Sequence, residues 1–128
     1  MALQNVWIYT RTTFNDNLFK ENTNNQFIFV SQRPYANKKD ASETGTTLTL
    51  QVVIDKGKYG VDKKTNLERD NNVYNTFDVT ILNNRQHIEA KKGDTIRLGD
   101  LIEEKTYIFD FNLILRYKSV QVIPRANK

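Results

Sequence analysis

The stretch TLTLQVVI at residues 47–54 decides the fold class of this chain, because apolar and polar side chains alternate along it. Successive side chains of a β-strand point to opposite faces, so this alternation predicts a strand with one buried face and one polar face. The face expected to be buried carries Leu48, Leu50, Val52 and Ile54, and the opposite face carries Thr47, Thr49 and Gln51.

Further strands are predicted on both sides of this one, in segments rich in β-branched and aromatic residues between polar turns. They span residues 5–10, 26–31, 73–82, 95–99, 106–117 and 119–123. In the 73–82 strand, Phe77, Val79 and Ile81 are expected to point inward. Residues 14–25 and 101–105 are predicted to be loops or short helical turns. No long segment has helical periodicity, so we expect an all-β or nearly all-β protein.

The length of 128 residues fits a single domain, and we expect residues 1–128 to form one. The chain contains no cysteine, which excludes disulfides and thiolate zinc sites. No apolar run approaches the roughly 20 residues of a membrane span, and the first residues lack a signal-peptide pattern. We therefore expect a cytoplasmic protein that does not contact a membrane.

Five or six twisted strands with long loops close most economically into a small barrel, because closure removes exposed sheet edges. We expect a five-stranded oligonucleotide/oligosaccharide-binding (OB) barrel, with a sandwich of similar strand count as the alternative. Residues 56–72 form a long polar excursion between two strands. Such an excursion in a small domain is usually functional or disordered.

The last third of the sequence indicates a binding function. The segment KKGDTIRL at 91–98 leads into the long aromatic strand 106–117, which also carries arginine. A single-stranded nucleic acid offers flat bases, which stack on aromatic rings for about 1–3 kcal/mol each, and phosphates, which attract Lys and Arg. The net charge of +4 favours an anionic partner only mildly.

Residues 44–124 resemble the bacterial and phage single-stranded DNA-binding proteins, which have one OB barrel. The resemblance rests on the strand at 47–55 followed by the polar 56–72 segment, the returning strand YNTFDVT at 74–80, the KKGDTIRL turn and the closing YKSVQVI at 117–123. It implies coating of single-stranded DNA in replication and recombination, assembly into a homo-dimer or homo-tetramer, and contact with replication or recombination proteins. It implies no cofactor.

Cellular members of that family end in an acidic tail that recruits partners, whereas this sequence ends in PRANK at 124–128. The resemblance is therefore to a phage or plasmid member without the tail, which would act in the host cytoplasm. Residues 1–44 have no clear counterpart in the family.

Rings and cations that fall in or beside predicted turns and on predicted strands are the candidate nucleic-acid contacts, and we expect fewer than half to touch the ligand. The candidate stacking residues are Trp7, Tyr35, Tyr59, Tyr74 and Tyr117, and the candidate phosphate contacts are Lys56, Lys58, Lys63, Lys64, Arg69, Lys91, Lys92, Arg97, Arg116 and Lys118. Tyr59 is the strongest candidate, because it lies in a lysine-rich loop with little core to join. Arg97 and Arg116 have an alternative as cross-strand partners of Asp110 or Glu89. The phenylalanines at 27, 29, 77, 109 and 111 are expected in the core.

No catalytic or metal-binding residues are predicted. The chain has one histidine, no cysteine and neither a glycine-rich phosphate loop nor a Gly-x-Ser-x-Gly elbow. His87 is expected at the surface, and the aspartates match no carboxylate motif. The main alternative function is a non-enzymatic interaction protein, such as a virion or accessory replication component with a small barrel or sandwich. An RNA-directed module is a third possibility.

Overall fold

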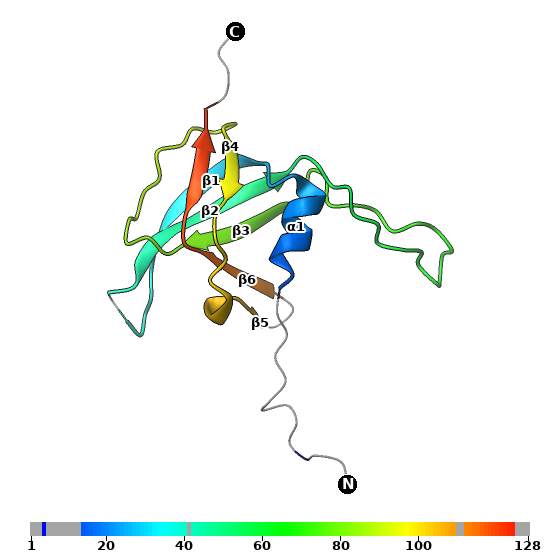
Figure 1. Cartoon of the computed structure of the whole chain (residues 1–128), viewed down its shortest axis with the longest axis horizontal. Helices are drawn as coiled ribbons and strands as arrows, with labels where there is room; N and C mark the ends of the chain where they lie inside the picture. The colour runs from blue at the N-terminus through cyan, green and yellow to red at the C-terminus, as the bar shows by residue number, and fades with distance from the viewer. Residues whose placement is uncertain (1–3, 5–13, 41, 110–111, 125–128) are drawn as a thin grey trace.

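A computed structural model describes residues 4, 14–40, 42–109 and 112–124 of the chain (Figure 1). Within this part there are one short helix, a 3-10 turn and seven strand segments. In chain order they are α1 (Asp16–Thr23), β1 (Phe27–Ala36), β2 (Thr44–Val52), β3 (Thr76–Ile81), β4 (Thr95–Leu98), η2 (Glu103–Lys105), β5 (Tyr107–Phe109), β6 (Asn112–Tyr117) and β7 (Val120–Ile123). The predicted strand at residues 5–10, with Trp7, lies outside the described part.

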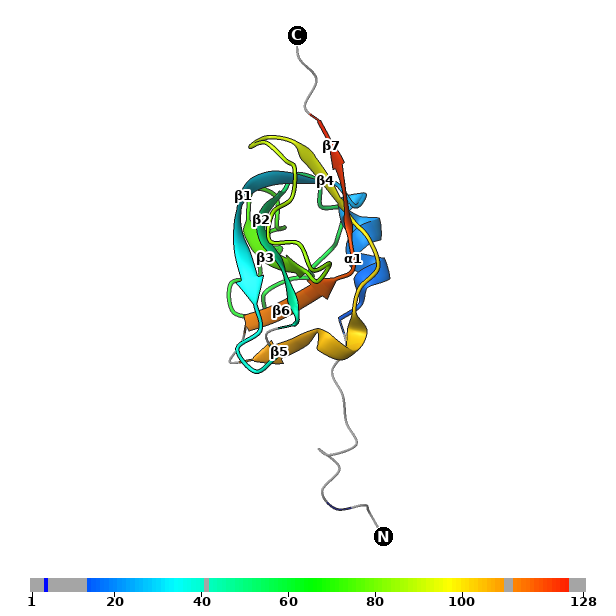
Figure 2. The same cartoon turned by 90° about the vertical axis from the view of Figure 1, so that its left-hand side faces the viewer.

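The strands form one sheet in the order β5-β6-β3-β2-β1-β4-β7, antiparallel throughout except for the β3–β6 pair. The segments β6 and β7 are separated by only Lys118 and Ser119, yet they pair with strands on opposite sides of the sheet. The sheet must therefore curl round on itself, as Figure 2 shows. The prediction of a mostly β, barrel-like fold is confirmed.

The described part contains seven strand segments, whereas the predicted OB barrel has five strands. The predicted segment 106–117 contains two strands, β5 and β6, which pair with each other antiparallel, and β7 follows the bend at Lys118 and Ser119 close to the predicted segment 119–123. The strand predicted at residues 26–31 corresponds to β1, which continues beyond it through Pro34 to Ala36. Because β4 pairs only with Phe27 and Ile28, the far half of β1 is an edge there, where proline is tolerated.

The core lies inside the curl and is built from alternate residues of the strands. Leu48, Leu50 and Ile81 are completely buried, as the alternation predicted, and Phe27 and Ile96 join them. Phe77 is half-buried and packs against this cluster. The side chain of Phe109 and the whole of Phe111 lie outside the described part.

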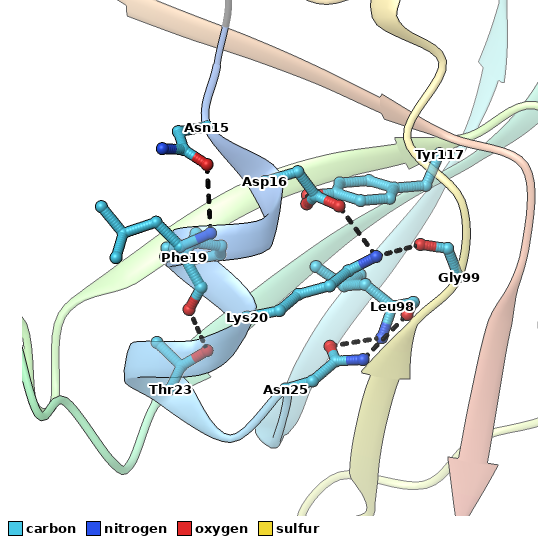
Figure 3. Close-up of polar contacts among 10 residues, drawn as sticks. Asn15, Asp16, Phe19, Lys20, Thr23, Asn25, Leu98, Gly99 and Tyr117 are labelled. Carbon is cyan, nitrogen blue, oxygen red and sulfur yellow. Dashed lines mark hydrogen bonds and ion pairs between the residues drawn. The ribbon is translucent and has the colours of Figure 1, made fainter.

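Helix α1 covers one side of the sheet, where a loop or short helical turn was predicted. It begins at Asn15, whose side chain accepts a hydrogen bond from the Leu18 N–H, and ends at Asn24 in the left-handed conformation. The Phe19 ring stacks on Phe27 at 5.5 Å between centroids and meets Phe77 edge-on at 5.5 Å. Beyond the helix, the Asn25 amide exchanges two 2.9 Å hydrogen bonds with the Leu98 backbone, as a neighbouring strand would (Figure 3).

Residues 53–75 form a long projection from the end of β2 and β3, visible at the right of Figure 1. Its two arms run antiparallel: Val61 and Glu68 form an isolated β-bridge, and the Arg69 N–H donates to the Gly60 carbonyl at 2.8 Å. We call this segment the long loop. It corresponds to the polar excursion seen in the sequence.

Gly45 allows β2 and β3 to approach closely at the end of the sheet. A Cβ atom at this position would lie 1.9 Å from the Ile81 carbonyl oxygen. We expect Gly45→Ala to force the strands apart and to lower the free energy of unfolding by about 1–3 kcal/mol, as overpacking does. Urea denaturation followed by circular dichroism measures the loss.

The matched control is Gln121→Ala, an exposed position on β7 that should change stability by less than about 0.5 kcal/mol. A Gly45→Ala variant as stable as this control would show that the close approach of β2 and β3 is wrong.

Candidate nucleic-acid interface

The outward side of β1, β2, β3 and β6 carries a polar surface that we call the sheet face. One row of it crosses all four strands, because Arg33 pairs with Thr47, Thr47 with Thr80, and Thr80 with Arg116. The neighbours of these residues along each strand, such as Leu48 and Val79, point into the core. The full sheet face consists of Arg33, Tyr35, Thr47, Thr49, Asp78, Thr80 and Arg116. Within it Thr47 and Thr80 are themselves buried, with 7% and 4% of their surface accessible.

Two of the predicted contact residues meet on the sheet face. The Arg116 guanidinium carbon lies 5.0 Å from the centroid of the Tyr35 ring, in a cation–π contact. Its Nη1 donates to Thr80 Oγ1 at 3.2 Å, and the hydroxyls of Thr80 and Thr47 are 3.0 Å apart. Among the described residues, the Arg116 guanidinium contacts Thr80, Tyr35 and the Leu115 carbonyl, and Asp110, one of the two partners predicted for it, lies outside them. A ring and a cation from distant parts of the sequence thus share one surface.

Arg33 is a residue of the sheet face that sequence analysis missed. Its Nη2 lies 3.1 Å from Asp78 Oδ2, and the other carboxylate oxygen accepts a 2.7 Å hydrogen bond from Thr49. In the sequence, Pro34, two lysines and Gly45 predict a flexible connection over residues 33–46, whereas β1 continues to Ala36 and β2 begins at Thr44. Polar Arg33 and Tyr35 alternate with Pro34, and this period of two could have been used to predict a longer strand.

Tyr74 is the most exposed large hydrophobic residue in the described part of the chain, with 77% of its surface accessible. Its backbone has φ 74°, in the left-handed region that bulky residues avoid. The cause is a bulge: the Tyr74 N–H donates to the Val52 carbonyl, and the Val52 N–H donates to the Asn75 carbonyl, so two residues face one. Because the ring is exposed, its burial does not offset the cost of this backbone conformation. Strained backbone positions of this kind cluster at functional sites.

The lysines of the long loop are exposed, but the loop is close to neutral. Lys56, Lys58, Lys63, Lys64 and Arg69 alternate with four carboxylates, Asp55, Asp62, Glu68 and Asp70. Opposite charges this close in sequence weaken the attraction that the lysines exert on a distant polyanion. The loop is therefore a less cationic surface than its lysines alone suggest.

Tyr59, the strongest candidate from the sequence, joins the two arms of the long loop. Its hydroxyl donates to Asp55 Oδ2 at 2.6 Å and accepts from Asn72 Nδ2 at 3.1 Å. Asp55 also accepts from the Asn72 and Gly57 N–H groups. Burial alone would raise the pKa of the Asp55 carboxyl, but these hydrogen bonds outweigh it and lower the pKa. Arg69 donates to the Tyr59 carbonyl at 2.9 Å and so braces the same loop.

An apolar groove of about 780 Å³ lies between α1, the base of the long loop and the diverging ends of β3 and β6. The strands β3 and β6 pair only from Val79 to Ile81, and the groove occupies the space before that ladder begins. Leu18 and Leu113 on its walls are 50% and 40% exposed. The ring of Tyr59 also lines it.

The prediction that Tyr117 is a stacking residue is wrong. Its ring is completely buried, and its hydroxyl donates to Asp16 Oδ1 at 2.6 Å beneath α1 (Figure 3). Burial, together with the hydrogen bond to Asp16, raises the pKa of the Tyr117 hydroxyl, so it remains protonated. The alternation of β6 places Tyr117 on the inward side, next to outward Arg116, and this pattern was available in the sequence.

The remaining predicted cations lie away from the sheet face. Lys91 and Lys92 are exposed in the turn before β4, Arg97 is exposed on β4 opposite Gln121, and Lys118 is exposed at the bend before β7. The structure therefore brings together Tyr35 and Arg116 and leaves these four in other parts of the fold.

The described residues contain no group of three or more histidine or acidic side chains arranged to hold a metal ion. Among the same residues, no helix is long and apolar enough to cross a membrane. No known protein family matches the chain, and neither a curated protein nor a solved structure is significantly similar to it.

The burial of Tyr117 gives a test that separates its structural role from binding. We expect Tyr117→Phe to lower the free energy of unfolding by about 1.5–3 kcal/mol, because it removes a hydrogen bond to a carboxylate that is only 12% exposed. Its affinity for any nucleic acid should equal that of the wild type. The control is Tyr107→Phe, whose 50% exposed side chain should make the change neutral. A binding defect in folded Tyr117→Phe would contradict this assignment.

Tyr74 gives a test in which stability and binding move in opposite directions. Tyr74→Gly should raise the free energy of unfolding by about 1 kcal/mol, because glycine adopts the left-handed conformation without steric cost. It should also lower affinity for a dT oligonucleotide about tenfold, the loss expected for one stacking contact. Thermal unfolding and fluorescence anisotropy on the same samples give both values.

The control for Tyr74→Gly is Asn24→Gly, at the C-terminal end of α1, where φ is 56°. That variant should gain stability and leave affinity unchanged. Unchanged affinity in Tyr74→Gly would remove Tyr74 from the interface.

Proposed function

We propose that this protein binds and coats single-stranded DNA without strong sequence preference, through the sheet face and without catalysis. The observation that carries the proposal is the row in which Arg116 lies 5.0 Å from the Tyr35 ring and is held there by Thr80. A base can stack on a ring and a phosphate can bind a guanidinium, and neither interaction depends on which base is present. The Thr47 and Thr80 hydroxyls are buried, and Thr80 contributes by accepting the hydrogen bond that positions Arg116.

The connectivity of the sheet supports a closed OB barrel. β1, β2 and β3 follow one another as antiparallel neighbours, β1 also pairs with β4, and β3 pairs in parallel with β6. If β6 and β7 are taken as one bent strand, that strand pairs with β3 at one end and with β4 at the other. Counted in this way, the pairings are those expected of a five-stranded barrel with one added arm, β5, which supports the proposed OB fold. OB barrels bind oligonucleotides on the face of their second and third strands, which here is the centre of the sheet face.

The resemblance to single-stranded DNA-binding proteins supports the same biological setting. Under this proposal the protein acts as a homo-dimer or homo-tetramer in DNA replication or recombination, as a phage or plasmid member would in the host cytoplasm. Replication or recombination proteins are its further partners. No cofactor enters the proposed activity, because stacking and phosphate contacts need none.

The apolar groove favours a second candidate function, as an interaction or virion accessory component that binds another protein. Leu18 and Leu113, which line it, are half-exposed apolar side chains on adjacent elements. An interface of this kind depends on apolar burial, so its affinity would change little with salt.

The experiment that tests the proposal is a fluorescence-anisotropy titration of a labelled dT oligonucleotide at low and high salt. Duplex DNA and a matched RNA serve as competitors. We expect tight binding that prefers the DNA single strand and weakens as salt rises. Arg116→Gln should lower affinity about tenfold and reduce the slope of log K against log salt by about 0.7, the value for one phosphate on a single strand.

Arg97→Gln on β4 is the matched control, because it removes the same charge from an exposed position outside the sheet face. It should change affinity much less than Arg116→Gln. Absence of dT binding at micromolar protein would overturn the proposed function and favour a protein partner at the groove.

A further inference from the structure

The tip of the β1–β2 hairpin is joined by an ion pair to η2, the turn that precedes β5. The Glu43 carboxylate binds the Lys105 ammonium of η2. Glu43 is itself positioned by Asn37, whose Nδ2 donates to Glu43 Oε1 at 3.3 Å and whose N–H donates to the Glu43 carbonyl at 3.0 Å. Residues 37–43 are the loop between β1 and β2.

Lys105 adjoins the sheet face. The next residue, Thr106, accepts a 3.2 Å hydrogen bond from the Arg116 N–H through its hydroxyl oxygen. The Lys105 side chain is 44% exposed, whereas the Glu43 side chain is 18% exposed. The hydrogen bond between them raises the pKa of Lys105 and lowers the pKa of Glu43, so both are charged at neutral pH.

The same hairpin tip also touches β6 through Tyr35, which precedes the loop by two residues. The Tyr35 ring is covered by the Arg116 guanidinium at 5.0 Å. Both contacts across this end of the sheet therefore use groups that a single strand needs: an ammonium, a guanidinium and a ring. In the free protein each of these groups already has a partner from within the chain.

We propose that Glu43 is a built-in competitor for nucleic-acid phosphate, which occupies Lys105 in the free protein and is replaced when a strand binds. The inference rests on the proposed function and adds a regulatory contact to the same site. A carboxylate and a phosphate both accept charge-assisted hydrogen bonds from an ammonium, so either can fill this position. Because the pair is partly exposed, it is weak enough to be exchanged.

The exchange discriminates between ligands. An isolated phosphate gains Lys105 only by displacing Glu43, and the two interactions nearly cancel. A single strand that displaces Glu43 also places a base at Tyr35 and a neighbouring phosphate at Arg116, which adds stacking and a second charge contact. The Glu43 carboxylate therefore lowers the affinity of the protein for small anions. A single strand still binds, because it contacts Lys105, Arg116 and Tyr35 together.

The test is Glu43→Gln, which removes the charge and keeps an oxygen that can accept from Asn37. We expect it to bind a labelled dT oligonucleotide about two- to fivefold more tightly than the wild type at the same salt, the factor that corresponds to an exposed ion pair. The gain should disappear when Lys105→Gln is added, because the competitor acts through Lys105 alone. Thermal unfolding of each variant checks that the fold is retained.

The matched control is Glu21→Gln, which removes one negative charge from an exposed position on α1. Any increase in affinity for the dT oligonucleotide should be at most a few tenths of the increase seen with Glu43→Gln. A gain that persists in the Lys105→Gln background, or that Glu21→Gln reproduces, would reflect net charge and overturn the inference. Equal or weaker binding by Glu43→Gln would overturn it too, while wild-type binding of dT would leave the proposed function standing.

Discussion

The register between β1, β2 and β3 is the constraint on which the rest of the structure depends. Leu48 and Leu50 are completely buried between neighbours on both sides. A slip of one residue would turn both to solvent, at a cost of about 1.5–3 kcal/mol for each side chain. Burial of the inward residues therefore also fixes the outward ones, and the row from Arg33 to Arg116 follows from it. The candidate interface is positioned by the core beneath it, without interactions of its own being required.

The sequence predicted this inner layer well and the interface only in part. Alternation in β2 and β3 is a local pattern, so it could be read without knowing which strands pair. The contact between Tyr35 and Arg116 could not be predicted from the sequence, because it depends on the order of four strands in the sheet. Tyr117 was misassigned for a related reason: an aromatic residue beside a cation was interpreted as surface, although the strand period places neighbours on opposite faces. The burial of its hydroxyl required Asp16 of α1, which is far away in sequence.

The distribution of charge shows why composition was a weak guide to function. The net charge of +4 is small, and several cations are paired within the chain: Arg33 with Asp78, Lys105 with Glu43 and Lys20 with Asp16. Such pairing reduces long-range attraction to a polyanion. Affinity for a single-stranded nucleic acid must then come from short-range contacts. In these a base stacks on a ring, and a cation exchanges a carboxylate of the protein for a phosphate.

The two ends of the central strands hold their rings in different ways. At one end, the Tyr35 ring is covered by Arg116, which is itself hydrogen-bonded to Thr80, and a ligand can replace this cation–π contact. At the other end, Tyr74 is placed by the backbone bulge opposite Val52, and its ring is almost free of contacts, as its 77% exposure shows. A side chain displayed by the backbone needs little rearrangement to bind, because the cost of placing it was met during folding. The ring at Tyr74 is thus ready to accept a base, whereas Tyr35 must first leave its cation. This difference predicts an order of events in which a strand engages Tyr74 before it opens the hairpin tip at Tyr35.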